Sequence, residues 1–372
     1  MMALFDNEFE LFPSKFNEIL QRVQRVDPVK YGRSRNFIDG AVTYLSPYIS
    51  RGVISTKFIL EYVLNKGYKP IAIEKFIQEL AWRDYWQNVW IAKQDTIDTD
   101  LKKPQEEVEN YGIPDAILNA TTAIEAIDKA IMDFYKTGYI HNHVRMYLSS
   151  IACNIGGSHW NYPARWMYYY LLDADWASNA LSWQWVVGSN STKKYYANQA
   201  NINKYCYTHQ EHTFLDVSYE KLKTLAVPEK LGTIVRPNLE TPLPPKKSIQ
   251  VRPELPTLIY NFYNLDPQWK KEILANRIIL LEPSLFKKYP ISQKSIDFVL
   301  ALKENIENAQ VYVGAFNELV NEYRLKEIYY KEHPLNGHYE GIAESRDWMF
   351  TVQGYYSSFF GFWKKCKKEL NY

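Results

Sequence analysis

The residues of this chain with the clearest chemical potential lie in one stretch, LLDADWASNALSWQWVVGSNS, at residues 171–191. It places two carboxylates, the amide of Asn179 and three indoles within about five helical turns, so polar groups and large π-systems share neighbouring faces. An ordinary buried helix would carry Leu and Ala there, and an unpaired buried carboxylate is costly. The combination favours a buried, flat ligand that forms hydrogen bonds. The alternative is a Trp-rich core helix with solvated acids.

A second polar cluster lies upstream, in GYIHNHVRM at residues 138–146, where His141, Asn142, His143 and Arg145 are close neighbours. A guanidinium can bind a carboxylate in a fork geometry, and a buried pair of this kind is rarely retained for stability alone. Because Asp173 is the natural partner for Arg145, we expect an ion pair that holds two helices together at a binding site.

A third cluster, FIQELAWRDYWQNVW at residues 76–90, carries Glu79, Trp82, Arg83 and Trp86 on one helical stripe. By itself, a Trp stripe at helical spacing is more often part of a core than of a cofactor site. Its presence beside two other polar and aromatic clusters favours a site.

These segments resemble the FAD-binding domain of the photolyase and cryptochrome flavoproteins. The resemblance runs from about Lys30 to about Tyr205, and its four motifs occur in the order of that family. It implies a mainly α protein with an all-α, photolyase-type FAD-binding domain. The motifs are RNFIDGAVTYLSPYISRGVIS (35–55), FIQELAWRDYW (76–86), TGYIHNHVRM (137–146) and LLDADWASNALSWQW (171–185).

The resemblance implies FAD as the cofactor. Arg145 and Asp173 match the family's ion pair over the isoalloxazine, and Asn179 matches the residue that faces flavin N5, although an ordinary packing amide is the alternative for Asn179. Backbone N–H groups at a helix start suit the FAD phosphates. The residues that the resemblance assigns to those phosphates are Thr43, Leu45 and Ser46, with Tyr31 assisting, and the further implied flavin contacts are Arg83, Asn142, Ala174 and Asp175.

Repair enzymes of this family hold a flipped-out pyrimidine dimer beside the flavin, between an acid and aromatic walls. The chain matches that pocket at Glu79, Trp82, Met146 and Trp185, with Asn179 as a further catalytic residue. A carboxylate of Glu79 paired with Arg83 is the alternative. Stacking of about 1–3 kcal/mol per base can offset the cost of extrusion.

We therefore expect a carbon–carbon lyase that splits cyclobutane pyrimidine dimers in DNA, by electron transfer from photoexcited reduced FAD. A cryptochrome-type blue-light sensor without repair activity is the main alternative. A flavin-storing or nucleic-acid-binding module with a decayed site is a third.

The resemblance also implies an electron relay from the flavin to the surface. Trp183 matches its flavin-proximal member and Trp160 its middle member, although core packing alone would also explain Trp160. Counting along the chain puts Glu107 at the distal position. The distal member therefore stays open among Trp86, Trp90, Trp166, Trp176 and the tyrosines.

The net charge is only +2, so the balance of charge does not indicate nucleic acid. Local basic residues do indicate nucleic acid, because a groove beside a pocket needs positive charge to bind a DNA backbone. Tyr44 and Asn198 stand where many repair enzymes carry Arg, so single-stranded as well as double-stranded DNA is a candidate partner. The candidate nucleic-acid contacts are Arg33, Arg35, His143, which replaces a basic residue of the family, Lys193 and Lys194.

The sequence gives little indication of a metal, of export or of membrane insertion. The three cysteines give no disulfide framework and cannot build a four-cysteine iron–sulfur cluster, and no zinc motif appears, so we expect no metal. No long apolar run occurs, and the first residues carry acids where a signal peptide carries basic residues. We expect a cytoplasmic protein with no membrane partner.

The composition along the chain suggests a helical FAD-binding domain at residues 1–225, a linker at 226–256 that holds seven of the 18 prolines, and a small α/β domain at 257–372. The last part alternates apolar runs with a helical pattern, which predicts a small, mostly parallel, Rossmann-like sheet. It resembles the family's antenna domain, moved to the C-terminal end. A second, antenna chromophore is not predicted by any motif. The predicted strands lie in 257–265, 276–283, 309–316 and 325–333, the predicted helices in 292–306 and in an aromatic segment at 347–370.

Overall fold

The computed structural model describes residues 11–370, and their contacts divide them into two compact units. The chain is largely helical, as predicted. Each unit joins segments that are far apart in the sequence, so the linear division at residues 225 and 256 stays a prediction. The mixed unit comprises residues 11–29, 43–92 and 240–370, and the helical unit comprises residues 30–42 and 93–239.

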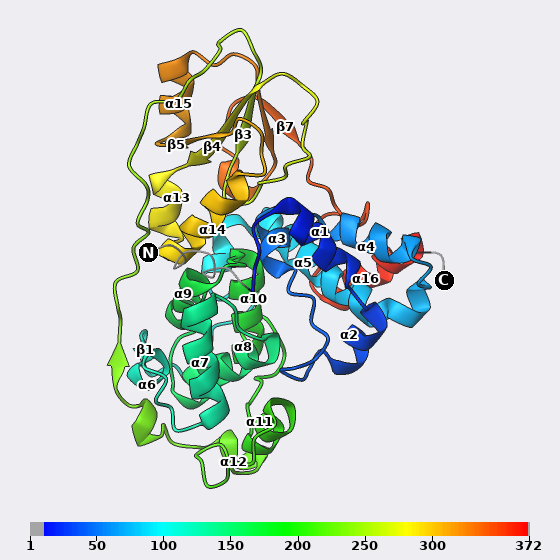
Figure 1. Cartoon of the computed structure of the whole chain (residues 1–372). Coiled ribbons are helices and arrows are strands. Elements are labelled where there is room, and N and C mark those ends of the chain that lie inside the picture. The colour runs from blue at the N-terminus through cyan, green and yellow to red at the C-terminus, as the bar shows by residue number, and fades with distance from the viewer. Residues whose placement is uncertain (1–10, 371–372) are drawn as a thin grey trace, which may run out of the picture. The chain divides into compact units, whose positions relative to one another are not determined.

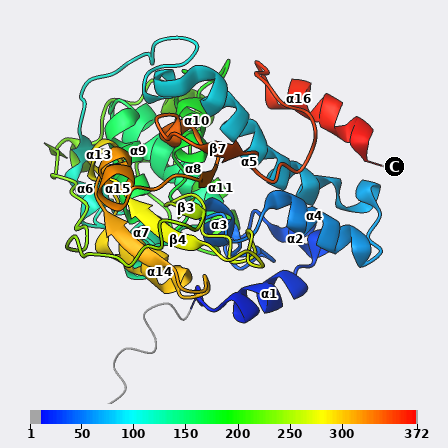
Figure 2. The same cartoon turned by 90° about the horizontal axis from the view of Figure 1, so that it is seen from above.

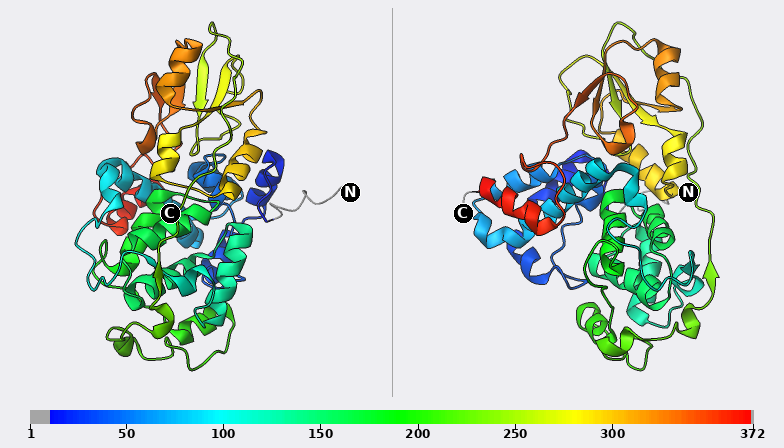
Figure 3. Two further views of the ribbon diagram at one scale, coloured as in Figure 1. Left: turned by 90° about the vertical axis from the view of Figure 1, so that its left-hand side faces the viewer. Right: turned by 180° about the vertical axis from the view of Figure 1, so that it is seen from behind.

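The helical unit is built from helices with buried apolar stripes. In α7, Ile127, Ile131 and Phe134 lie on one face and are fully buried. Gly138 ends this helix with φ 68°, a left-handed conformation that glycine adopts without steric cost. Figure 3 shows these helices in cyan and green. They are α6 (Asp115–Leu118), α7 (Glu125–Thr137), α8 (Asn142–Ser149), the π-helical turn η3 (Ser150–Ile155), α9 (Asn161–Tyr170), α10 (Trp176–Val187), α11 (Gln199–Cys206) and α12 (Tyr219–Leu222).

Short elements complete this unit. The 3-10 helices are η2 (Gln94–Asp98) and η4 (Glu229–Leu231). Strand β1 (Ile113–Pro114) pairs antiparallel with β2 (Ile234–Val235), which lies inside the segment predicted as a linker. After β2, residues 236–256 contain no helix or strand. The short helix α2 (Pro28–Ser34) is divided between the two units.

The mixed unit combines helices from both ends of the chain with a sheet. Its longest helix, α5 (Glu74–Lys93), carries the Trp stripe predicted from the sequence. The other helices are α1 (Phe16–Gln24), α3 (Ser46–Ser50), α4 (Thr56–Asn65), η1 (Pro70–Ile73), α13 (Pro283–Lys288), α14 (Gln293–Lys303), α15 (Phe316–Tyr323), η5 (Pro334–Asn336), α16 (Phe359–Cys366) and η6 (Lys367–Glu369).

The sheet has five strands, all parallel, in the order β5-β4-β3-β6-β7. Numbered along the chain, this order is third, second, first, fourth and fifth, the arrangement of a doubly wound sheet. β3 and β4 are buried along their whole length, as expected for central strands covered on both faces. Figure 1 shows α15 beside the strands, and its apolar side chains join their core. The strands are β3 (Thr257–Tyr260), β4 (Asn276–Leu281), β5 (Gln310–Val313), β6 (Ile328–Lys331) and β7 (Ile342–Glu344).

The structure confirms the four predicted strands and the parallel sheet. The first strand is shorter than predicted because Asn261 and Asn264 exchange backbone hydrogen bonds in a turn directly after Tyr260. The prediction of one helix over residues 347–370 was wrong for its first half. The backbone N–H groups of Met349 and Gly354 donate to side chains of α5 instead of helical carbonyls, so helix α16 begins only at Phe359.

Candidate functional site

The expected ion pair between Arg145 and Asp173 is present in the helical unit. Nη2 of Arg145, on α8, lies 3.2 and 3.0 Å from the two carboxylate oxygens of Asp173, in the turn before α10. Nε of the same arginine donates to the backbone oxygen of Ile140 at 2.9 Å. One nitrogen therefore contacts both oxygens, in place of the predicted fork. Asp173 is buried, so the pair fixes the start of α8 against the turn that precedes α10.

Polar side chains at the start of α10 are held by neighbouring backbone. Asp175 caps the helix by accepting from the backbone N–H of Ser178 at 2.7 Å. The buried Asn179 donates from Nδ2 to the backbone oxygen of Ala164 on α9 at 2.7 Å. Ala174, between the two aspartates, is fully buried. The amide of Asn179 is thus oriented by its own domain.

His141, at the start of α8, presents an unsatisfied polar atom. Its Nδ1 accepts from the backbone N–H of His143, which assigns the ring proton to Nε2. Burial, with the charges of His143 and Arg145, lowers the pKa of His141 to about 4, so the ring is neutral near pH 7. Among residues 11–370, buried Nε2 of His141 and Oγ of Ser178 have no hydrogen-bond partner. Such groups suit a polar ligand with acceptor oxygens.

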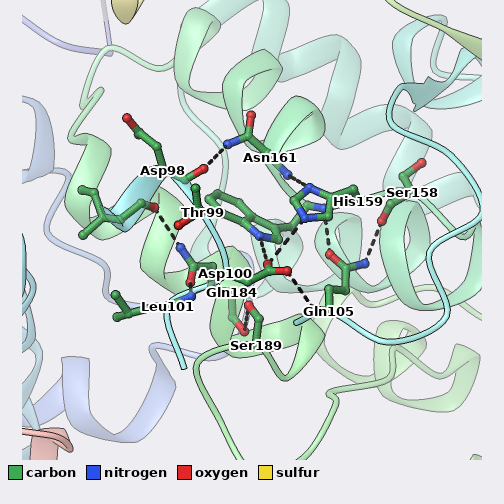
Figure 4. A network of polar contacts seen from close by, with 12 residues as sticks. Asp98, Thr99, Asp100, Leu101, Gln105, Ser158, His159, Asn161, Gln184 and Ser189 are labelled. Atoms are coloured by element: carbon green, nitrogen blue, oxygen red, sulfur yellow. Dashed lines mark hydrogen bonds and ion pairs between the residues drawn. The ribbon is translucent and has the colours of Figure 1, made fainter. Parts of the chain in front are cut away.

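Two buried tryptophans of the helical unit are tied to one acidic segment, whose Asp98 and Asp100 are labelled in Figure 4. Nε1 of Trp160 donates to Asp100 at 2.7 Å, and Nε1 of Trp176 donates to Asp98 at 2.6 Å. Gln184 on α10 binds the backbone on both sides of this segment. Its side-chain amide donates to the Ile97 oxygen and accepts from the Leu101 N–H, each at 2.9 Å. Sequence reasoning missed Asp98 and Asp100. A buried indole N–H requires an acceptor, but the sequence does not show which one.

Trp160 also lies in a row of rings that reaches the surface. Its ring centroid is 6.4 Å from that of Trp176 and 5.8 Å from that of His159. His159 in turn stacks on Tyr111 at 5.4 Å, and the Tyr111 side chain is 62% exposed. Trp183 is buried in α10. Glu107, at the counted distal position, forms an ion pair with Lys194.

In the mixed unit, α5 brings together Glu79, Trp82 and Arg83. Nη1 of Arg83 donates to Oγ of Ser50 at 2.6 Å, which ties α5 to α3. The Trp82 ring stacks on Phe359 of α16, with centroids 3.8 Å apart and planes inclined by 10°. Figure 2 shows α16 running beside α5. One face of the predicted pocket tryptophan is therefore covered by a side chain of the protein itself.

The predicted phosphate segment is also in the mixed unit. The backbone N–H of Leu45 donates to Oγ1 of Thr43 at 3.4 Å, and α3 starts at Ser46. Tyr44 between them has φ 53°, a left-handed value that is uncommon for a residue other than glycine. Its ring packs near Phe12. The local backbone is therefore sharply turned at this point.

The remaining predicted residues differ in exposure. Arg33, Asn142 and Lys193 are exposed, whereas Tyr31, Arg35 and Met146 are half-buried. Lys194 is bound to Glu107, and Trp185 is 40% exposed near Tyr195. Of the predicted flavin contacts, the helical unit holds Tyr31, Asn142, Arg145, Asp173, Ala174, Asp175 and Asn179, and the mixed unit holds Thr43, Leu45, Ser46 and Arg83.

Within residues 11–370, no group of three or more His, Cys, Asp or Glu side chains is arranged to hold a metal ion. No helix in this same range is long and apolar enough to span a membrane.

Residues 76–215 match the family model described as the FAD-binding domain of DNA photolyase. This match agrees with the four sequence motifs and with the Arg145–Asp173 pair. Through this region the chain is similar to the photolyase/cryptochrome family.

Curated relatives agree with this placement. A deoxyribodipyrimidine photo-lyase of Alkalihalophilus pseudofirmus is 28% identical over 165 residues, which cover 44% of this chain and 34% of the relative. The photo-lyase of Streptomyces griseus is 28% identical over 152 residues, which cover 41% and 33%. The chain thus matches about a third of the length of these relatives. A crystal structure of a Synechocystis cryptochrome aligns with a TM-score of 0.46 at 23% identity, over 55% of this chain and 46% of that one.

Proposed function

We propose that this protein is a light-driven DNA repair flavoprotein that binds FAD and splits cyclobutane pyrimidine dimers. The observation that carries the proposal is the grouping of Arg145, Asp173 and Asn179 in a region matched to the FAD-binding domain of photolyases. The names of the curated relatives support repair as the reaction.

The residues present fit a flavin dinucleotide. The unsatisfied donor of His141 and the hydroxyl of Ser178 suit the carbonyl and hydroxyl groups of such a ligand, and Arg145 adds a cation for its anionic form. When bound in its reduced form and excited by light, FAD would supply one electron to the dimer and recover it after ring opening. Arg145 and Asp173 would hold the cofactor, and Asn179 would present an oriented amide to it.

The lesion would be held by the four residues that match the repair pocket. Glu79 would hydrogen-bond the dimer, while Trp82 and Trp185 would stack on its bases and Met146 would contact it. Bases in this position are shielded from water, which favours charge transfer over side reactions.

A second candidate function, blue-light sensing without repair, is favoured by the stack of Phe359 on Trp82. A base cannot stack on a ring face that Phe359 occupies. In the repair model the lesion must either displace this phenyl ring or use the other face of Trp82, whereas a sensor could keep the ring in place.

The relay would start at Trp183 and pass through Trp160. We propose that it ends at Tyr111, because His159 connects Trp160 to this exposed ring. Each electron passed inward would leave Tyr111 oxidised, with its phenolic proton lost to water, and a thiol in solution would restore it by giving up one electron and one proton. Asp100 would accept the proton of the oxidised Trp160 indole through their 2.7 Å hydrogen bond. Replacement of Trp160 by Phe should slow flavin photoreduction, and an unchanged rate would rule out this route.

The decisive experiment is a repair assay with the flavin-loaded, chemically reduced protein. A thymine-dimer oligonucleotide is illuminated, and the recovery of thymine absorbance is measured. We expect recovery with the natural protein and a loss of about tenfold or more in Glu79→Ala, which removes a charged hydrogen bond. Glu61→Ala, an exposed acid on α4 of the same unit, is the matched control. Flavin photoreduction without thymine recovery would refute repair and support the sensor.

A further inference from the structure

Four aromatic rings form a row in the helical unit, and the row ends at His143, next to the flavin-assigned Asn142. Tyr207 stacks on Phe37, with centroids 5.6 Å apart and planes inclined by 22°. Phe37 meets Tyr205 edge-on at 5.0 Å, and Tyr205 stacks on His143 at 4.9 Å. The backbone N–H of Ile38 donates to the Tyr205 oxygen, so the two segments are held together. We call these four residues the aromatic row.

The outermost ring of the row is placed against local preference. Tyr207 follows the last residue of α11 with φ 56°, a left-handed position at which glycine is favoured and other residues cost roughly 1–2 kcal/mol. Its side chain is 56% exposed, so little burial offsets that cost. The stack on Phe37 and the hydrogen bond to Asp39 hold the ring at the surface. An exposed ring presented in this way suits a flat partner.

Basic side chains accompany the row. Nζ of Lys204 lies 5.2 Å from the Tyr205 ring centroid. Lys30 and Arg33, both exposed, and Arg35, half-buried, lie on the segment that leads to Phe37. Asp39 hydrogen-bonds the Tyr207 hydroxyl. The basic side chains favour a polyanion with planar groups as the partner.

His143 contributes a ring face and not a charge. Its Nδ1 lies 2.8 Å from the Asn36 oxygen. Burial and the nearby Arg35 lower its pKa, while the Asn36 contact raises it by a smaller amount. His143 stands where the family carries a basic contact, and here the position is stacked on Tyr205. A phosphate contact has been exchanged for an aromatic one.

We propose that the aromatic row is a binding site for unpaired nucleotides of single-stranded DNA. A base would stack on the exposed face of Tyr207, and Lys204 and Arg33 would contact the backbone phosphates. Stacking platforms flanked by cations bind single strands without sequence preference, because every base has a π-face. A duplex conceals those faces inside its own stack. This site extends the proposed function to DNA without a lesion and depends on neither flavin nor light.

The test is fluorescence anisotropy of a labelled, undamaged oligothymidine strand with the protein as purified, in the dark. Tyr207→Gly removes the ring and suits the left-handed backbone, so the fold should be at least as stable. We expect the dissociation constant to rise about 5- to 150-fold, the equivalent of one lost stack. Tyr207→Phe should bind like the natural protein. Met132→Ala, at an exposed apolar side chain on α7 of the same unit, should change the affinity by less than twofold.

Two further binding measurements complete the test. A duplex of equal length should bind more weakly than the single strand, and Lys204→Ala should reduce the salt dependence by about one phosphate contact. Equal affinity of Tyr207→Gly and natural protein, an equal loss in Met132→Ala, or a tighter duplex would overturn the proposal. These outcomes are independent of the repair assay, which needs a dimer, reduced flavin and light.

Discussion

Helices α5 and α10 are both rich in tryptophan and polar groups, yet they satisfy those groups in different ways. On α10, Asn179 and Gln184 bond to backbone groups of α9 and of the segment after η2, all within the helical unit. On α5, Asp84 and Asn88 accept from the backbone of residues 349 and 354, and Tyr85 donates to the oxygen of Tyr356.

The same C-terminal segment covers the rest of α5. Glu74 accepts from the Trp363 indole at 3.2 Å and binds Lys367 at 3.0 Å. Together with the stack of Phe359 on Trp82, these contacts follow α5 for most of its length. Polar groups beside indoles are thus bonded to neighbouring segments of the helical unit on α10 and to a distant chain segment on α5.

The largest expected effect tests the α10 side of this comparison. Arg145→Ala removes the cation from the buried Asp173 carboxylate and should lower the free energy of unfolding by about 3 kcal/mol. The purified variant should also retain little flavin. Urea unfolding and flavin absorbance measure both effects. Lys129→Ala, exposed on α7, should change stability by less than about 0.5 kcal/mol. Full flavin retention in Arg145→Ala would contradict the assigned role.

The next effect tests the α5 side. Phe359→Ala should cost about 3 kcal/mol, because a buried phenyl ring is lost and one face of Trp82 is uncovered. Hydrogen exchange along α5 should rise, as fewer contacts hold the C-terminal segment. Phe360→Ala, its 67% exposed neighbour on the same helix, is the matched control. If both variants lose equal stability, the stack is not what holds the segment.

Phe359→Ala also separates the two candidate functions. In the repair model the variant should bind dimer DNA more tightly than the natural protein, because Phe359 no longer competes for the Trp82 face. Binding titrations with dimer-bearing and undamaged oligonucleotides measure this. Unchanged affinity for the dimer would place the lesion away from Trp82.

The smallest effect concerns the pH dependence of the α5 contacts. Burial raises the pKa of Asp84 to about 6, against the opposing hydrogen bonds from Met349 and Thr56. A raised carboxyl pKa means that the folded state favours the proton. This contribution to stability is therefore complete below the ordinary pKa of 3.8 and is lost as the pH rises through about 6.

Asp84→Asn should flatten the pH dependence of the unfolding free energy between about pH 4 and 7, because the amide keeps the polar contacts without titrating. Urea unfolding over this range measures the slope. Glu254→Gln, an exposed acid of the same unit, should leave the slope as it is. A slope in Asp84→Asn equal to that of the natural protein would assign the dependence to another group.

The sequence was most informative where the signal is local. The apolar runs predict β3, β4, β5 and β6, and the signal is clearest for β3 and β4, because these inner parallel strands are buried along their whole length. The pairing of Arg145 with Asp173 followed from their charges and from the cost of burying either alone. The exact geometry of this ion pair could not be predicted, since Nε of Arg145 donates to the backbone oxygen of Ile140.

Residue types and their spacing therefore determined the family resemblance, the motifs, the ion pair and the parallel sheet. Only the tertiary structure decided that Phe359 covers Trp82, that Asp98 and Asp100 hold two indoles, and that the aromatic row forms. Each of these contacts joins residues that are from 60 to more than 250 positions apart. Periodicity describes one element at a time, whereas such contacts depend on which of many chemically equivalent partners folding brings within reach.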